Sequence, residues 1–68
     1  MTTLEIINEA KARLDNVNMR SSAEVNIKDA IMWLNEGNEE FARYRALKAL
    51  QYAVGIMAPI YIKASKQA

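Results

Sequence analysis

Apolar residues recur along the first third of the chain at the three- and four-residue spacing of an amphipathic helix. The stripe consists of Leu4, Ile6, Ile7, Ala10, Leu14 and Val17. Thr2 precedes it and Glu5 follows Thr2 by three residues, which is the pattern of a capping box at a helix start. These features predict a helix over residues 3–15, followed by a polar turn rich in Asp and Asn.

A second stripe with the same spacing follows that turn. It consists of Ala23, Ile27, Ala30, Ile31 and Leu34, with Val25 and Trp33 at its sides. Ser21 and Glu24 form a second capping-box pattern. Gly37 suits the left-handed conformation in which helices commonly end. A helix is therefore predicted over residues 22–36.

The third apolar segment begins directly after Gly37, and Asn38 is its predicted N-cap. Such a short connection makes the second and third helices antiparallel neighbours in a tight hairpin. The third helix is predicted over residues 39–58, and it carries apolar side chains on two faces. One face has Leu47, Leu50, Val54, Met57 and Tyr61, and the other has Ala49, Tyr52, Ala53 and Ile56. A helix that is apolar on most sides is typical of a central position in a fold.

Pro59 leaves two continuations open. In the favoured one, Gly55 lies four residues before the proline and lets the helix kink, so that it continues to about residue 65. In the other, the helix stops at Ala58 and Ile60–Ile62 is extended. In both cases the predicted fold is all-α, a small three-helix arrangement in one domain over residues 1–68 with the last helix central.

The composition excludes several kinds of chemistry. The 68 residues include no Cys and no His, so disulfides, thiolate sites and triad catalysis are not expected. Paired carboxylates such as Glu5 with Glu9 are read as solvated helix faces, and there is no glycine-rich phosphate loop. The start of the chain lacks the pattern of a signal peptide, and the longest uncharged run, residues 49–62, is shorter than the ~20 residues of a membrane span. The expectation is a cytoplasmic, non-enzymatic protein without catalytic, metal-binding or cofactor-binding residues.

Charge is distributed unevenly, although the net charge is only +1. All eight acidic residues lie between Glu5 and Glu40, whereas residues 41–68 carry only basic ones. The candidate contacts for an anionic partner are Arg43, Arg45, Lys48, Lys63 and Lys66. They could also pair with the acidic half of the same chain. Binding of a DNA groove by the third helix is disfavoured, because Glu39 and Glu40 occupy the end that would enter it.

The excess of apolar surface on the third helix predicts association with a protein partner, most simply as a homodimer. The candidate association surface consists of Ala49, Tyr52, Ala53, Ile56 and Ile60. The leading functional hypothesis is therefore an interaction or oligomerisation module, such as a small regulator or adaptor. Nucleic-acid binding through the basic C-terminal third is the alternative. A further alternative is peripheral membrane association, in which Ile56, Ile60 and Ile62 insert and Lys63 and Lys66 meet anionic headgroups.

One short segment resembles a known type of helical hairpin. It comprises Ala30, Trp33, Leu34, Gly37 and Asn38, followed by Ala42. This spacing resembles the hairpins of tetratricopeptide-like repeats and of small nucleotide-binding helical domains. The chain has room for one such repeat, and no His is present for the basic–His motif of ribonuclease-type domains. The resemblance thus implies a hairpin and transfers no functional residue.

Overall fold

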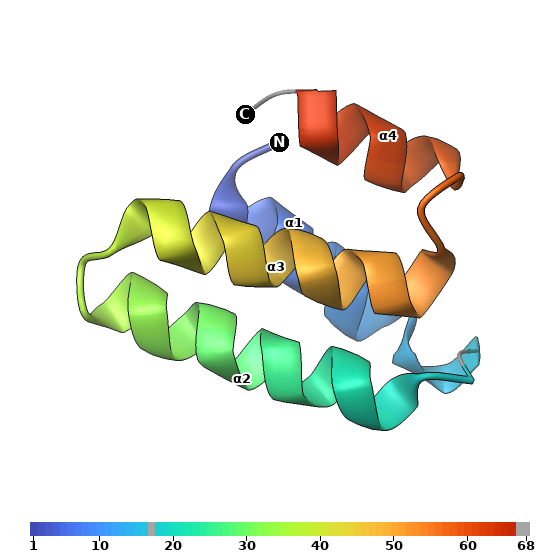
Figure 1. Ribbon diagram of the computed structural model, residues 1–68, viewed down its shortest axis with the longest axis horizontal. Helices are drawn as coiled ribbons and strands as arrows, with labels where there is room; N and C mark the ends of the chain where they lie inside the picture. Colours follow the sequence, from blue (N-terminus) through green and yellow to red (C-terminus); the bar gives the residue numbers. More distant parts are fainter. Residues whose placement is uncertain (17, 67–68) are drawn as a thin grey trace.

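The computed structural model describes residues 1–16 and 18–66 and is all-helical over them, which confirms the predicted fold class. Its elements are α1 (Thr3–Ala12), a short 3₁₀ turn (Leu14–Asn16), α2 (Arg20–Asn35), α3 (Glu39–Val54) and α4 (Pro59–Lys66). Figure 1 shows α3 between α2 and α4, with α1 behind it. Helix α3 packs against each of the other three helices, so it is the central helix, as predicted.

The predicted capping box at the start of α1 is present. The Thr2 hydroxyl accepts a hydrogen bond from the Glu5 backbone N–H, and the Thr2 N–H donates to the Glu5 carboxylate at 2.8 Å. The bond from the Thr2 backbone is the main cause of the lowered pKa of Glu5. Helix α1 ends at Ala12, three residues earlier than predicted, and Val17 lies outside the described residues.

Helix α2 begins earlier than predicted, and its predicted capping box is wrong. The helix starts at Arg20, so Ser21 lies inside its first turn, and the N-cap residue Met19 makes no capping hydrogen bond through its side chain. Glu24 instead accepts a hydrogen bond from Arg20 Nε at 2.7 Å, which raises the pKa of Arg20. An i,i+4 ion pair across the first turn has taken the place of the expected serine cap.

The connection between α2 and α3 agrees with the prediction. Gly37 has φ 81°, and the Asn38 side chain accepts a hydrogen bond from the Phe41 backbone N–H at 3.1 Å. The two helices run antiparallel and make the most extensive helix–helix contact of the fold (Figure 1). Local backbone chemistry at two residues is therefore enough to set this hairpin.

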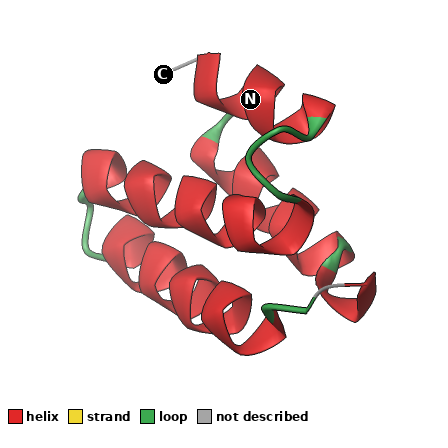
Figure 2. Cartoon of the chain, turned by 45° about the vertical axis from the view of Figure 1, so that its right-hand side comes forward, coloured by secondary structure: helices red, strands yellow, loops and turns green. Residues whose placement is uncertain are grey.

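The chain breaks at Gly55 and forms a fourth helix, instead of the one bent helix or the extended end that the sequence suggested. Helix α3 ends at Val54, Gly55 has φ 90° and ψ 151°, and Pro59 is the first residue of α4. Both residues occupy positions typical for them, glycine just after a helix and proline at the first helical position. Helix α4 consequently turns back and lies along α3 (Figures 1 and 2).

The Gly55 conformation leads to a stability prediction. A backbone with these angles is nearly restricted to glycine, so Gly55→Ala should destabilise the protein by about 1–3 kcal/mol. No atom lies within 4 Å of an added Cβ, so the loss would come from the backbone alone. Urea unfolding of chemically synthesised chains tests this. D-alanine at position 55 should leave stability near that of the wild type, and equal losses for the two enantiomers would contradict the backbone explanation.

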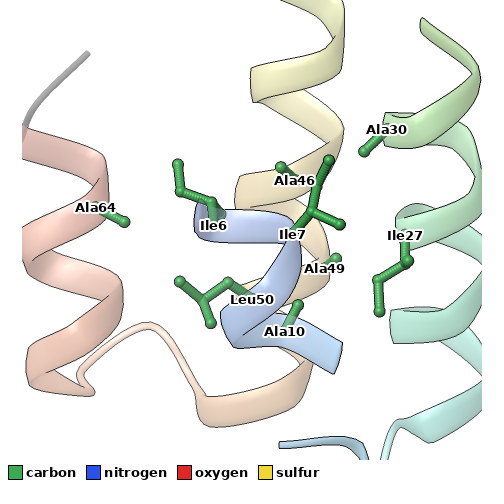
Figure 3. Packing of buried hydrophobic residues seen from close by; sticks show 9 residues of the cluster. All are labelled: Ile6, Ile7, Ala10, Ile27, Ala30, Ala46, Ala49, Leu50 and Ala64. Atoms are coloured by element: carbon green, nitrogen blue, oxygen red, sulfur yellow. The ribbon is translucent and has the colours of Figure 1, made fainter. Parts of the chain in front are cut away.

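The core lies where α1, α2, α3 and α4 meet. Figure 3 shows its buried cluster, which consists of Ile6, Ile7, Ala10, Ile27, Ala30, Ala46, Ala49, Leu50 and Ala64. Leu50 and the two isoleucines of α1 are its largest fully buried side chains. All the remaining members except Ile27 are alanines, whose small size lets the helix backbones approach closely.

Two predicted core positions are wrong. Leu4 is 56% exposed, and Met57, in the break after Gly55, is 81% exposed. The inward face of α1 begins at Thr3 instead of Leu4, and the buried Thr3 hydroxyl donates a hydrogen bond to the Glu39 carboxylate at the start of α3. The predicted Ile6, Ile7 and Ala10 are buried on this face.

Candidate partner-binding surface

The structure divides the association surface predicted from the sequence. Ala49 is fully buried in the core, so it is not available to a partner. Ile60 packs from α4 against the core of its own chain. Tyr52, Ala53 and Ile56 remain at the surface and line one depression near the end of α3. Ile60 is half-buried and lines a second depression with Ala53, so Ala49 is the member of the predicted set that is lost to the core.

The basic residues are divided as well, and Arg43 has a structural role. Its Nη1 donates to the Met1 carbonyl at 2.9 Å, and its Nη2 donates to the Ala64 carbonyl at 3.0 Å. Arg43 therefore ties the start of the chain and α4 to α3. Lys63 and Lys66 are exposed on α4, which lies on the opposite side of α3 from α2 (Figure 1).

Three aromatic side chains gather across the α2–α3 hairpin and form what we call the aromatic cluster: Trp33, Phe41 and Tyr44. The Trp33 and Phe41 rings are stacked, with centroids 4.9 Å apart and planes 17° apart. Phe41 meets Tyr44 edge-on, with centroids 6.5 Å apart. Phe41 is 45% exposed and Tyr44 is 49% exposed, and both line a shallow depression with Asn38 and Glu40. The cluster thus presents large ring surfaces to the outside of the molecule.

Arg45 and Lys48 lie next to the aromatic cluster and form what we call the cationic pair. Arg45 Cζ lies 5.5 Å from the centroid of the Tyr44 ring, and Lys48 Nζ lies 5.9 Å from it. Both distances are within the range of cation–π attraction. Arg45 Nη1 also donates to Asn26 Oδ1 of α2 at 3.3 Å. Arg45 is therefore held against α2, and both cations lie beside the exposed Tyr44 ring.

Tyr52 lies one turn beyond Lys48 and marks the other end of this face. One depression beside it is lined by Ser21, Ser22, Val25 and Asn26 of α2 together with Tyr52. The depression that includes Ile56 also contains Tyr52 and Met19. We call these two adjoining depressions the Tyr52 groove. The aromatic cluster, the cationic pair and the Tyr52 groove follow one another along α3 and together form the hairpin surface.

Phe41 was missed by the sequence reasoning, although a signal for it exists. Trp33 and Phe41 lie four residues before and four residues after Gly37. Residues equally distant from the turn oppose each other in a tight antiparallel hairpin, so these two rings could have been paired. Tyr44, three residues after Phe41, then falls on the same side of α3.

Two other features are absent from the part of the chain that the structure describes. In residues 1–16 and 18–66, no three acidic side chains lie close enough together to bind a metal ion. Over the same ranges, no helix has the length and apolar character needed to cross a membrane. Comparisons with protein-family models, with curated proteins and with solved structures found no match to this chain.

Proposed function

We propose that this protein is a non-enzymatic helical module that binds another protein through the hairpin surface. The observation that carries the proposal is the aromatic cluster, in which Phe41 and Tyr44 stay about half exposed and Phe41 is stacked on the less exposed Trp33. Tryptophan, tyrosine and arginine are the residues most enriched at energetically important interface positions. Trp33, Tyr44 and Arg45 supply all three types within one patch.

The exposed rings are not a sign of an incompletely folded chain. A folded monomer of 7.7 kDa is expected to have an accessible surface of about 4,300 Å². The surface of this chain is 4362 Å². The chain is therefore as compact as a typical monomer of its size, and it leaves the aromatic cluster outside while burying smaller alanines inside. The exposure of large aromatic rings in a compact chain favours a binding role for this surface.

The proposal predicts that Phe41→Ala weakens partner binding by at least about 30-fold, the effect of losing a strong interface residue. A photo-crosslinking amino acid at position 44 would first identify the bound protein in the cells that produce this chain. Calorimetry with the purified partner then gives the affinity of each variant. Leu4→Ala is the matched control, because Leu4 is exposed on α1 and outside the hairpin surface. Equal affinities for the two variants would contradict the proposal.

Self-association stays within the proposal as a special case, with a second copy as the partner. Sedimentation of the wild type across micromolar concentrations tests it, and Phe41→Ala should abolish any dimer formed through this face. The dimer expected from the sequence has less support now, because Ala49 and Ile60 contribute to the core of a single chain.

Nucleic-acid binding is the second candidate, favoured by the contact of Arg45 and Lys48 with the exposed Tyr44 ring. Aromatic rings beside cations bind single strands by stacking and phosphate contact. Glu40 lines the same depression as Phe41 and Tyr44, and its charge opposes a polyanion there. Titration with a labelled oligothymidylate at low salt, repeated at higher salt, decides between the candidates.

A further inference from the structure

The order of chemical groups along the hairpin surface identifies the kind of partner segment that fits it. We infer that the surface binds an amphipathic helix of another protein that has apolar residues at its two ends and carboxylates in its centre. This inference rests on the proposed function and deepens it. Three observations support it: the spacing of residues on α3, the two-helix shape of the surface and the position of the charges on that surface.

The spacing along α3 is that of one helix face. Phe41, Arg45, Lys48 and Tyr52 follow one another at intervals of four, three and four residues. At 1.5 Å per residue, the distance from Phe41 to Tyr52 along the axis is about 16 Å, or three turns. A facing helix of similar length would present residues i, i+4, i+7 and i+11 to these four positions.

Helix α2 contributes to both ends of this face, which makes the surface suited to a helix. Trp33 stacks on Phe41 at one end, and Val25 lies with Tyr52 in the groove at the other. Apolar side chains from two antiparallel helices thus lie at each end, separated by the cationic pair. A bound helix would place apolar side chains at i and i+11 against these ends, as amphipathic helices do in helix-binding grooves.

The centre of the surface determines the charge of the occupant. The half-buried Arg45 and Lys48 occupy the two middle positions of the face, so carboxylates at i+4 and i+7 of a bound helix would complement their charges. A second copy fits less well, because α3 helices paired antiparallel about this centre would place Arg45 opposite Lys48. A nucleic acid also fits less well, because Glu40 occupies the aromatic end.

Two synthetic helical peptides test the inference. Each has about 18 residues, enough for the three turns and their flanks, with leucine at i and i+11. One has glutamate at i+4 and i+7, and the other has lysine there. Trp33 is the only tryptophan of the chain and lies in the aromatic cluster, so its fluorescence reports binding without a label, provided that the peptides contain no tryptophan. The glutamate peptide should bind at least about tenfold more tightly than the lysine peptide.

Charge reversal provides the decisive variants. In Arg45→Glu/Lys48→Glu the preference should reverse, so that the lysine peptide binds more tightly. Lys48→Glu alone should reduce the preference and avoids disturbing the hydrogen bond between Arg45 and Asn26. Lys11→Glu on the exposed side of α1 is the control and should leave the preference unchanged. Circular dichroism confirms that each variant is folded.

The other outcomes overturn the inference. Equal binding of the two peptides, binding of neither, or a preference for lysine would each reject an acidic helix as occupant. So would dimer formation by the wild type through this face, or tighter binding of an oligothymidylate than of the glutamate peptide. The proposed function fails separately, when Phe41→Ala and Leu4→Ala bind the crosslinked partner equally. If Phe41→Ala weakens binding of the crosslinked partner but the two peptides bind equally, the proposed function is supported and the acidic helix is rejected.

Discussion

Replacing Leu50 with alanine should lower the free energy of unfolding by about 2–5 kcal/mol. Leu50 is fully buried on α3 and belongs to the cluster where the four helices meet. Its neighbours there include several alanines, whose short side chains cannot fill the cavity that the substitution leaves. A 68-residue domain has a total stability of about 3–10 kcal/mol, so this loss is a large part of it.

Urea unfolding followed by circular dichroism measures the effect, and Leu4→Ala is the matched control. It removes the same atoms from a side chain that is mostly exposed, so its cost should be below about 0.5 kcal/mol. Similar midpoints for the two variants would show that Leu50 does not occupy the centre of the core.

Replacing Arg43 with methionine should destabilise the protein by about 2–3 kcal/mol. The substitution removes the two hydrogen bonds from the guanidinium group to the Met1 and Ala64 carbonyls. Hydrogen bonds to charged groups contribute about 1.5–3 kcal/mol each, and the half-buried position reduces their sum. Methionine has nearly the helix propensity of arginine, so α3 itself should not be weakened.

Arg13→Met makes the same chemical change at a surface ion pair. Arg13 bonds to Glu9 at 3.2 Å with both side chains well exposed, and such pairs contribute between about 0 and 1 kcal/mol. The loss of stability for Arg43→Lys should lie between the losses for Arg43→Met and Arg13→Met, because a single ammonium group cannot reproduce the forked guanidinium that reaches both carbonyls. A loss for Arg43→Met no larger than that for Arg13→Met would remove the structural role assigned to this residue.

The sequence predicted several features that depend on short-range chemistry, although the Ser21 capping box was wrong. The Thr2 capping box, the left-handed Gly37 and the Asn38 cap depend on a few neighbouring residues, and all are present. Gly55 and Pro59 were noticed but were interpreted as the two parts of one kink. A glycine just after one helix and a proline at the first position of the next is also a local pattern, and this pattern would have predicted α4.

Contacts between residues far apart in the chain set the features that the sequence did not predict. The Thr3 hydroxyl donates a hydrogen bond to Glu39, which lies on another helix far along the chain. Arg43 binds backbone carbonyls, which carry no side-chain signature in a sequence. All five basic residues were therefore candidates for an anionic partner, and only the structure separates Arg43, which binds within the fold, from Arg45 and Lys48. The hairpin surface likewise depends on Trp33 and Phe41 meeting across a turn.

The position of Arg43 has a consequence for the order in which the chain folds. The α2–α3 hairpin is made of contacts close in sequence, and such contacts form early. Arg43 lies within this hairpin, but its two acceptors belong to Met1 and to Ala64 near the end of α4. Arg43 can hold both acceptors only after α1 and α4 have packed against α3. We expect these two helices to be locked in place after the hairpin has formed.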